Sequence, residues 1–370
     1  MKKAALITCH NIKNYGSVFQ TYATTKIFEK IGYDVTVIDY QRPGTDKKGF
    51  RKKILRESHL AQKPIIGLFF SIILLPSFFK MERVFDEFLR KRINLTKRTY
   101  LSENELKDNC PEADLYISGS DQIWNSDING RLERPYYLSF IQNEKTKISF
   151  ASSFGKTVLR SEEEEENRIL LGQYKWLSTR EQSGVEIIRR LGLDADVVLD
   201  PTFWLNKEEW DELAEQVKIP RHYILVYQLH KNADMDQYVK KLENDYSIPC
   251  IRIDFYYHYM VKAGRHLVCP TPGQVITLIK NADYVISDSF HMTAFSIIYN
   301  KLFLSIFSPN SFNDRISNIL KCFGLENRIL DKYTDSKELS ESINFNEVNS
   351  RLNIMRNNMW TLLEQRLSLL

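Results

Sequence analysis

Residues 4–39, AALITCHNIKNYGSVFQTYATTKIFEKIGYDVTVID, decide the fold of this chain. Residues 4–9 form a short apolar run that is typical of a buried strand, and the polar loop HNIKNYG follows them. A helical pattern begins at Ser17, stops at Gly32 and leads into the alternating strand VTVID at 35–39. A strand, a helix and a second strand in so short a stretch form a βαβ unit, which predicts a doubly wound parallel sheet.

The same alternation of strands and helices returns along the chain and starts afresh after Asp200-Pro201. In the first half, further strands are predicted in LYISG (115–119), ISFASSFG (148–155), 174–178 and VVLD (197–200). In the second half, they are predicted in YILVYQL (223–229), CIRID (250–254), YVISD (284–288) and LFLSI (302–306). Two such halves predict an α/β fold with two Rossmann-like domains facing a cleft, which resembles the GT-B architecture of many glycosyltransferases.

We predict a first domain over residues 1–200 and a second over 201–345. Apolar residues recur at helical spacing from Val348 to Leu367. Residues 346–370 are therefore expected to form a C-terminal helix that crosses back to the first domain.

Residues from about 46 to 100 interrupt the alternation and are interpreted as a helical insertion in the first domain. Within them, PIIGLFFSIILLPSFF (64–79) is nearly uncharged but shorter than the roughly 20 residues that a membrane-spanning helix needs. The basic cluster from Lys47 to Lys53 precedes it, and a basic cluster beside a short apolar segment is typical of a monotopic membrane contact. A buried helix or hairpin is the alternative, and both interpretations stay open.

Composition sets limits on the class of protein. The 370 residues carry a net charge of only +4, which argues against a dedicated nucleic-acid binder. The five cysteines are scattered and have no zinc-ligand spacing, so no metal site is expected and buried free thiols are favoured. The chain runs from MKKA into a strand whose apolar part is too short for a signal-peptide core, which favours a cytoplasmic protein.

The strand at 284–288 is predicted to bring three polar residues, Ser287, Asp288 and Ser289, to the carboxyl edge of the sheet. His291 then falls in the first turn of the next helix. Ligands of doubly wound sheets bind at this edge, and a helix N-terminus favours an anion such as a phosphate or carboxylate. The alternative is that these residues only cap the helix and that His291 is a surface residue.

The run NADYVISDSFHMTAFSIIYNKLF (281–303) resembles the C-terminal signature of the polysaccharide pyruvyl transferase family, which is centred on Ser-Phe-His. The resemblance continues in the family order through most of the chain, in the blocks GSVFQTYATTKIFEKIGYDVTVIDY, ADLYISGSDQIWN, ISFASSFG, STREQSGVEIIRRLG and DADVVLDPTFWL. Met292 stands where members usually have glycine, and Ser289 and Phe290 stand where some branches have arginine and leucine. An anion-pairing arginine would then come from elsewhere in this chain.

The resemblance implies a transferase of capsule or exopolysaccharide biosynthesis that uses phosphoenolpyruvate as co-substrate and needs no cofactor. The pyruvyl group would become a ketal that bridges two hydroxyls of one hexose, commonly the 4,6 pair. The acceptor would be a polysaccharide or a polyprenyl-linked saccharide, so the enzyme would work in the cytoplasm, and docking at the inner face of the membrane is expected if residues 64–79 are a membrane contact. The first domain would serve the acceptor and the second the donor.

His291 is the leading catalytic candidate, because imidazole titrates near neutrality, with an unperturbed pKa of about 6.5. It could protonate the departing phosphate or accept a hydroxyl proton, and the sequence does not choose between these roles. Asp121 and Asp288 are its candidate partners in acid/base chemistry.

Donor binding is predicted for a set of cationic and hydroxyl side chains at strand ends: Arg180, Ser287, Ser289, Arg315 and Lys231. Arg180 leads this set because a guanidinium can grip a phosphate or carboxylate with two hydrogen bonds. The alternatives are a surface charge pair of Arg180 with Glu181 and a solvated Arg315.

Acceptor binding is predicted for the first strand-to-helix loop and for the block GSDQIWN, through Asn14, Gly16, Ser17, Gln20, Gln122 and Trp124. Gly16 permits close backbone approach at the start of a helix, and an aromatic ring beside amide and carboxylate groups suits a sugar. Trp124 could equally be a core residue.

Two other functions stay open. A nucleotide-sugar glycosyltransferase would share the architecture, but it would need contacts for a base and a ribose in the second domain, and the sequence shows no dedicated signature for them. A non-catalytic sugar-binding or membrane-docking module is the alternative from another class, and it would survive replacement of His291.

Overall fold

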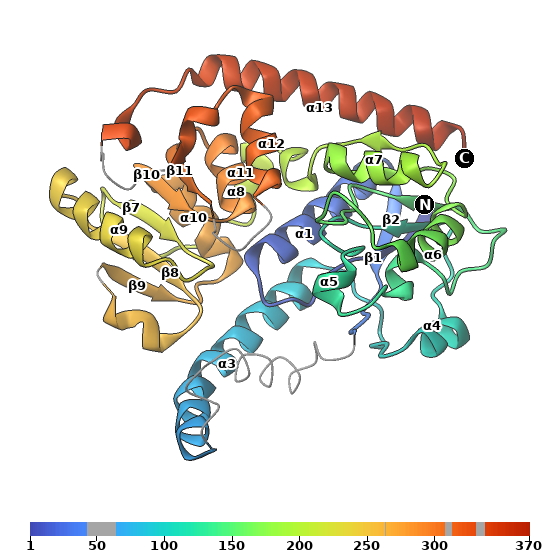
Figure 1. The fold of residues 1–370 in the computed structure, drawn as a ribbon, viewed down its shortest axis with the longest axis horizontal. Coiled ribbons are helices and arrows are strands. Elements are labelled where there is room, and N and C mark those ends of the chain that lie inside the picture. The colour runs from blue at the N-terminus through green and yellow to red at the C-terminus, as the bar shows by residue number, and fades with distance from the viewer. Residues whose placement is uncertain (43–63, 263, 308–312, 331–336) are drawn as a thin grey trace. The chain divides into compact units, whose positions relative to one another are not determined.

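The structure is a computed structural model that describes residues 1–42, 64–262, 264–307, 313–330 and 337–370. The described residues form two compact units (Figure 1). Unit 1 draws on Met1–Phe50, Asp86–Leu205 and Ile354–Leu370, and unit 2 on Arg51–Phe85 and Asn206–Asn353. The chain passes from unit 1 to unit 2 after Leu205, five residues beyond the predicted boundary.

Unit 1 is built on a parallel sheet of strand order β2-β1-β3-β4. Its strands are β1 (Lys2–Ile7), β2 (Tyr33–Val37), β3 (Leu115–Ser118) and β4 (Lys147–Ser149). The short parallel pair β5 (Ser178–Thr179) and β6 (Asp196–Val197) adjoins it through the bridges Ile148–Trp176 and Ser152–Thr179. The helices of this unit are α1 (Tyr15–Lys30), α4 (Glu103–Asn109), α5 (Ser126–Asn129), α6 (Ser161–Leu171) and α7 (Gln182–Arg190), with 3-10 turns at Arg134–Tyr137 and Pro201–Phe203.

The βαβ unit predicted at the start of the chain is present as β1, α1 and β2. Asn14 begins α1 as its N-cap, because its side chain accepts the Gly16 N–H at 2.8 Å. The last four side chains of β1 are all buried, as expected for a strand that is covered on both faces. The early apolar run and the capping residue therefore account for this part of the fold.

Unit 2 is built on a six-stranded parallel sheet of order β12-β11-β10-β7-β8-β9. The strands are β7 (Ile224–Tyr227), β8 (Cys250–Asp254), β9 (Arg265–Val268), β10 (Tyr284–Ser287), β11 (Leu302–Ile306) and β12 (Ile329–Leu330). The helices are α8 (Lys207–Asp211), α9 (Ala233–Tyr246), α10 (Pro272–Asn281), α11 (Phe290–Ile298) and α12 (Asp314–Phe323), with 3-10 turns at Tyr257–Val261, Glu326–Arg328 and Lys337–Ser340. Four of these strands match the predicted ones, whereas β9 and β12 were not predicted.

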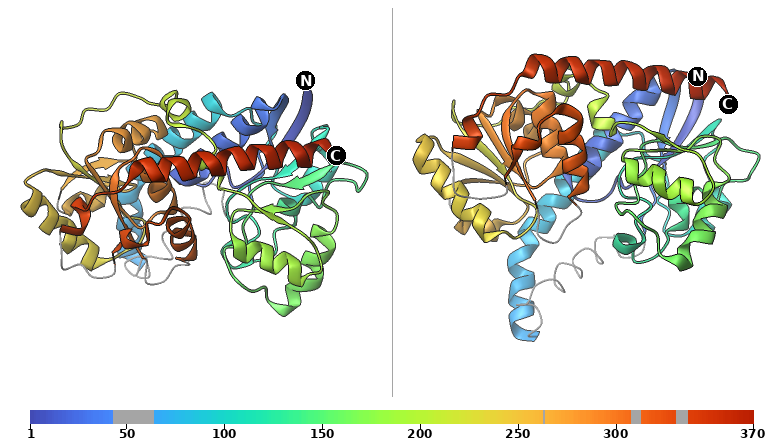
Figure 2. Two further views of the ribbon diagram at one scale, coloured as in Figure 1. Left: turned by 90° about the horizontal axis from the view of Figure 1, so that it is seen from above. Right: turned by 45° about the horizontal axis from the view of Figure 1, so that its top comes forward.

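The C-terminal helix α13 (Phe345–Ser368) is one long helix in both views of Figure 2. Its residues from Ile354 onward belong to unit 1. There, Arg366 pairs with Asp196 at 2.8 Å, and the Trp360 ring meets Trp204 with centroids 5.0 Å apart.

Helix α3 (Pro64–Arg92) contains the apolar segment 64–79 and continues through Pro76. Its residues up to Phe85 group with unit 2 rather than with the first domain, because Phe78 and Phe85 pack on the rings of Tyr256 and Phe255. None of the helices in the described ranges is long and apolar enough to cross a membrane. The basic cluster from Lys47 to Lys53 lies outside the described residues.

Each sheet reverses its direction of strand addition at one point. In unit 1, β2 lies on one side of β1 and β3 on the other, so the reversal falls between β1 and β3. In unit 2, β8 lies on one side of β7 and β10 on the other, so it falls between β7 and β10. Ligands of open parallel sheets bind at the carboxyl ends of the strands at such switch points. These two positions are therefore where a functional site is expected.

Candidate functional site

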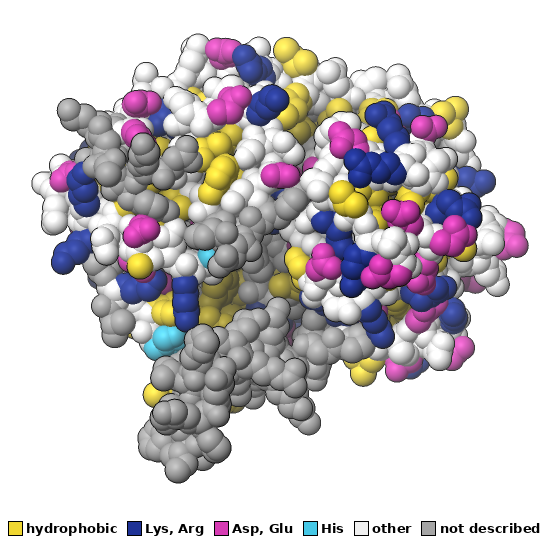
Figure 3. Space-filling view, in the orientation of Figure 1, with side chains coloured by type: hydrophobic (Ala, Val, Ile, Leu, Met, Phe, Trp, Pro, Cys, Tyr) yellow, Lys and Arg dark blue, Asp and Glu magenta, His cyan; other side chains and the backbone are white. Residues whose placement is uncertain are grey.

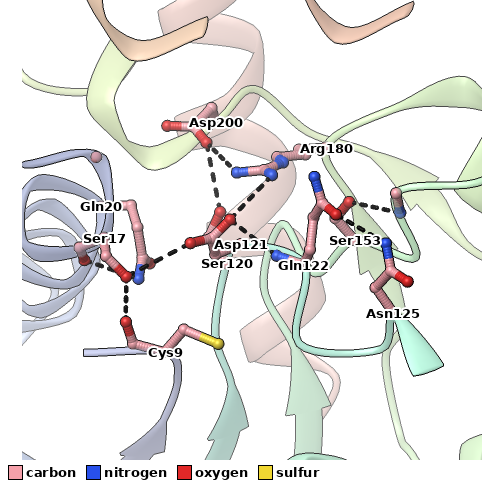
Figure 4. A network of polar contacts seen from close by, with 12 residues as sticks. Cys9, Ser17, Gln20, Ser120, Asp121, Gln122, Asn125, Ser153, Arg180 and Asp200 are labelled. Atoms are coloured by element: carbon pink, nitrogen blue, oxygen red, sulfur yellow. Dashed lines mark hydrogen bonds and ion pairs between the residues drawn. The ribbon is translucent and has the colours of Figure 1, made fainter. Parts of the chain in front are cut away.

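The switch point of unit 1 carries a cluster of buried polar side chains (Figure 4). They come from the ends of five strands (β1, β3, β4, β5 and β6) and from the first turns of α1, and all of them except the partly exposed Asp121 have buried side chains: Cys9, Ser17, Gln20, Ser120, Asp121, Ser153, Arg180, Glu181 and Asp200. Figure 4 shows Arg180 reaching toward Asp200 and Asp121, with Ser17 and Gln20 on the α1 side. A polar cluster buried at this edge of the sheet is consistent with a site rather than with a hydrophobic core.

Arg180 stands among three carboxylates. Its Nη1 lies 2.9 Å from Asp200 Oδ2, its Nη2 3.3 Å from Asp121 Oδ1, and its Nε 3.4 Å from Glu181 Oε2. Burial lowers the pKa of Arg180, but attraction to Asp200, Asp121 and Glu181 outweighs burial and raises the pKa above its ordinary value. The guanidinium predicted for the donor is therefore engaged by acidic groups of its own unit, and its donor role stays a prediction. Arg180 and Glu181 are not the surface pair that was the alternative, because both are buried.

The carboxylates of Asp200 and Glu181 accept hydrogen bonds from groups within unit 1. Asp200 Oδ1 accepts the Thr202 N–H at 3.0 Å and the Thr202 hydroxyl at 2.7 Å, while Oδ2 accepts Arg180. Glu181 Oε1 accepts the Ser153 hydroxyl. Both carboxylates are almost fully buried, so they hold Arg180 and the strand ends together.

Asp121 differs from these two carboxylates in exposure and in backbone conformation. Its side chain is 19% exposed, against 1% for Asp200 and 3% for Glu181, so it is the one of the three that a ligand could reach. Its φ of +76° lies in the left-handed region, which a residue other than glycine adopts only when its surroundings impose it. The Gln122 N–H, donated to Asp121 Oδ1 at 2.9 Å, and Arg180 supply that constraint.

The predicted acceptor residues of the first loop lie at this switch point. The Ser17 hydroxyl donates to the Cys9 carbonyl and lies 3.5 Å from Asp121 Oδ2. Gln20 Nε2 donates to Thr8 Oγ1 at 3.0 Å, which fixes the side chain inside the unit. Asn14 caps α1 by accepting the Gly16 N–H, so its oxygen already has a structural task.

The remaining two acceptor candidates, Gln122 and Trp124, differ in exposure. Gln122 stays partly exposed beside Asp121, and its Oε1 accepts the Asn125 amide at 2.8 Å. Trp124 is 2% exposed and stacks on Tyr137 with centroids 5.5 Å apart, while its Nε1 donates to the Tyr136 carbonyl at 3.3 Å. The structure thus places Trp124 in the core, the second of its two interpretations.

The switch point of unit 2 carries the predicted His291 loop. His291 lies in the first turn of α11, directly beyond the carboxyl end of β10, and is buried. The Ser287 hydroxyl donates to the Tyr227 carbonyl at 2.7 Å and accepts the Ser289 N–H at 3.0 Å. Ser289 is the N-cap of α11, but its hydroxyl makes no capping bond. The expectation that a serine or aspartate side chain caps this helix is therefore not met.

Asp288 turns away from α11 and toward the end of β7. Its Oδ1 accepts the Leu229 N–H at 2.7 Å, and its Oδ2 accepts the His230 N–H at 2.8 Å. The same Oδ2 lies 3.0 Å from His230 Nδ1. Asp288 therefore joins the two strand ends that flank the switch point.

Two further donor candidates lie at the same edge of the sheet. The Arg315 guanidinium, near the start of α12, stands 5.8 Å from the centre of the Phe290 ring, and that ring meets the His291 ring with centroids 5.1 Å apart. Lys231 is exposed in the loop after β7. Arg315 is thus brought beside the His291 loop, which sequence spacing alone did not establish.

Reasoning from the sequence missed Asp200, Ser120 and Ser153 in unit 1 and His230 in unit 2. Asp200 ends a predicted strand and His230 directly follows one, and that position was the available signal. In the described ranges, no group of three or more His, Cys, Asp or Glu side chains is arranged to hold a metal ion.

Comparison with known structures agrees with the predicted GT-B-like α/β fold built from two Rossmann-like units. UDP-GlcNAc 2-epimerase from Methanocaldococcus jannaschii matches with a TM-score of 0.51 at 12% identity, covering 96% of this chain and 93% of that one. UDP-N-acetylglucosamine 2-epimerase from Rickettsia bellii matches with a TM-score of 0.54 at 12% identity, covering 99% and 96%. At these low sequence identities, the structural similarity shows the fold alone, and it confirms the predicted fold class.

The sequence itself gives the family. No curated protein sequence matches this chain. Residues 14–307 match the family described as polysaccharide pyruvyl transferase, and this span includes both switch points and every predicted site residue except Arg315. The chain therefore belongs to the polysaccharide pyruvyl transferase family, as the resemblance of its motifs predicted.

Proposed function

We propose that this protein transfers the pyruvyl group of phosphoenolpyruvate to a hexose of a polysaccharide or lipid-linked saccharide, forming a ketal and releasing phosphate. The observation that carries the proposal is the position of His291, at the carboxyl end of β10 and beside the switch point of unit 2. Family membership supports the transfer of a pyruvyl group, and the site supplies an imidazole, which can act as a general acid or a general base.

The donor is assigned to unit 2 because its cationic groups follow adjacent parallel strands. Lys231, His291 and Arg315 come after β7, β10 and β11, whose carboxyl ends share one edge of the sheet. Phosphoenolpyruvate carries a phosphate and a carboxylate, and cationic side chains at a helix N-terminus suit both. The Ser289 hydroxyl, which makes no capping bond to α11, adds a donor at the same turn.

The acceptor is assigned to unit 1 because three carboxylates there surround one guanidinium. An excess of carboxylates repels an anionic donor but accepts hydrogen bonds from sugar hydroxyls. Asp121 is the reachable carboxylate of the three and is proposed as the group that contacts an acceptor hydroxyl.

The test is to incubate the protein with phosphoenolpyruvate and a panel of water-soluble and polyprenyl-linked sugars. Phosphate release that depends on the sugar, with a product whose mass shows a pyruvyl ketal, is the expected result. His291→Gln should lower the rate about 100-fold or more, because acid/base groups typically contribute that much. Glutamine is chosen because His291 is buried, so alanine would leave a cavity.

The competing functions give different results. A nucleotide-sugar glycosyltransferase would ignore phosphoenolpyruvate and consume a nucleotide sugar. If the protein were a sugar-binding module, wild type and His291→Gln would bind the acceptor equally well, and neither would release phosphate. Either outcome would overturn the proposal.

A further inference from the structure

His230 and Asp288 form a hydrogen-bonded pair across the switch point of unit 2. His230 follows β7, Asp288 follows β10, and Nδ1 of the imidazole lies 3.0 Å from Oδ2 of the carboxylate. The Asp288 side chain is 2% exposed, whereas that of His230 is 44% exposed. The carboxylate is therefore a buried anchor, and the imidazole extends from it toward solvent.

The pair also fixes which imidazole nitrogen can exchange a proton. Asp288 accepts two backbone N–H bonds besides the imidazole, and an ionised carboxylate can only accept. Nδ1 must then carry a hydrogen in both charge states of the ring. The proton that the ring gains or loses is the one on Nε2, on the side away from Asp288.

The same two strands provide a matched control at their other end. His222 precedes β7 and Asp283 precedes β10, and His222 Nδ1 lies 3.2 Å from Asp283 Oδ1. Asp283 also accepts the Tyr223 N–H at 2.8 Å, so the two pairs have similar bonding. They differ in location, because only His230–Asp288 lies at the carboxyl edge, where ligands of such sheets bind.

We propose that His230 is a second acid/base residue of the reaction, acting through Nε2, and that Asp288 positions it; this rests on the proposed pyruvyl transfer. As imidazolium, His230 gives its Nε2 proton to the methylene carbon of phosphoenolpyruvate, which becomes a methyl group and leaves C2 electron-deficient. The first sugar hydroxyl bonds to C2 and loses its proton to His291.

The remaining steps return both imidazoles to their starting forms. The bond from C2 to the phosphate oxygen breaks, and the phosphate leaves with the bonding electron pair and the proton held by His291. The second hydroxyl then bonds to C2 and gives its proton to Nε2 of His230. Two hydroxyl protons are released in all, one of which leaves with the phosphate while the other replaces the proton given to the methylene carbon. With a single imidazole, one group would have to serve both transfers in turn, whereas a second imidazole at this edge divides them between two groups.

The experiment compares His230→Ala with His222→Ala in the phosphate-release assay, each with and without added imidazole. His230→Ala is expected to lower kcat about 100-fold or more, and free imidazole should restore part of the loss. Protonated imidazoles of greater acid strength should restore more, because the group donates a proton to carbon. His222→Ala should keep the wild-type rate and show no response to imidazole.

Asp288→Asn tests the positioning role. It should lower kcat in the wild-type background but add little in the His230→Ala background, since residues that act as a unit are strongly non-additive. Circular-dichroism melting of both variants records any loss of folding.

The outcomes are distinct. Wild-type turnover by His230→Ala, or a loss that imidazole does not restore, would overturn the inference and leave the pair as a structural link between strands. If wild-type protein releases no phosphate from phosphoenolpyruvate with any acceptor, the proposed function fails first. If wild type is active and His230→Ala has the same turnover, only this inference is refuted and the proposed function stands.

Discussion

Arg180 Nη1 lies 2.9 Å from Asp200 Oδ2, with both side chains at 2% exposure or less. Asp200 in turn accepts the backbone and hydroxyl of Thr202, at the start of the 3-10 turn Pro201–Phe203. This ion pair therefore links the end of β5 to the last segment of unit 1 before unit 2 begins.

Arg180→Ala is expected to lower the free energy of unfolding by about 3 to 5 kcal/mol, because it leaves buried carboxylates without their counter-charge. Urea unfolding followed by circular dichroism measures this. Arg189→Ala is the control, since Arg189 lies on the adjacent helix α7 and is exposed. Wild-type stability combined with weaker phosphoenolpyruvate binding by titration would instead support the donor role predicted from the sequence.

Asp121→Asn should reduce turnover about 100-fold while leaving the fold intact. Asparagine tolerates the left-handed conformation that Asp121 adopts, but its neutral amide accepts a weaker hydrogen bond from a sugar hydroxyl than a carboxylate does. Asp121→Ala should be less stable than Asp121→Asn, because alanine at φ +76° is strained. Steady-state phosphate release and thermal melting check both statements, and unchanged kcat in Asp121→Asn would remove Asp121 from the acceptor chemistry.

The pair His10–Asp39 should make stability depend on pH. His10 Nε2 lies 3.0 Å from Asp39 Oδ1. Burial raises the pKa of Asp39, but hydrogen bonds from His10 and Thr99 outweigh it and hold the pKa below its ordinary value. A lowered folded-state pKa gives stability that is present above the unfolded pKa of about 3.9 and is lost as pH falls through the folded pKa.

Asp39→Asn should accordingly destabilise the protein at pH 7 by about 1 to 3 kcal/mol, and the difference from wild type should shrink as the pH is lowered below about 4. Urea midpoints across this range measure the effect. Asp34→Asn, exposed on β2 of the same unit, should show no such dependence. A difference that grows toward acid pH would contradict the assignment.

Helix α3 has an exposed apolar face in addition to the apolar face that is buried in the protein. Leu74 and Phe78 are buried, whereas Ile72, Ile73 and Phe79 are 55%, 54% and 58% exposed. If this face touches the inner membrane surface, the protein should float with anionic vesicles. Replacing both Ile72 and Ile73 by Asp should then release it without lowering the melting temperature, because neither side chain is buried.

Ile169→Asp is the matched control for that experiment, since Ile169 is 53% exposed on α6 of unit 1. It should leave flotation unchanged. Equal flotation of the Ile72 and Ile73 double variant and of wild type would show that α3 does not dock the protein. Figure 3 shows basic and acidic side chains interspersed over the described residues of the face in view.

The predicted elements show how far local sequence reaches. The apolar run at 4–9 and the loop that follows it predicted β1, α1 and β2, because a buried strand and a capped helix leave their patterns within a few residues. The predicted strand at 284–288 likewise indicated the position of His291, since a strand followed directly by a helix puts the intervening residues at the carboxyl edge. By contrast, β9 is only partly buried and begins with two polar residues, and β12 has only two residues, so neither strand leaves an apolar run that can be recognised in the sequence.

By itself, the sequence determined the alternating α/β order, the family, and which polar residues follow strands. Only the tertiary structure decided which of those residues meet. Arg180 lies 59 residues from Asp121 and 20 from Asp200, and His230 lies 58 residues from Asp288. These partners come together because of the order in which strands add to each sheet. That strand order arises from the packing of helices and strands that are far apart in the chain, so a local sequence pattern does not reveal it.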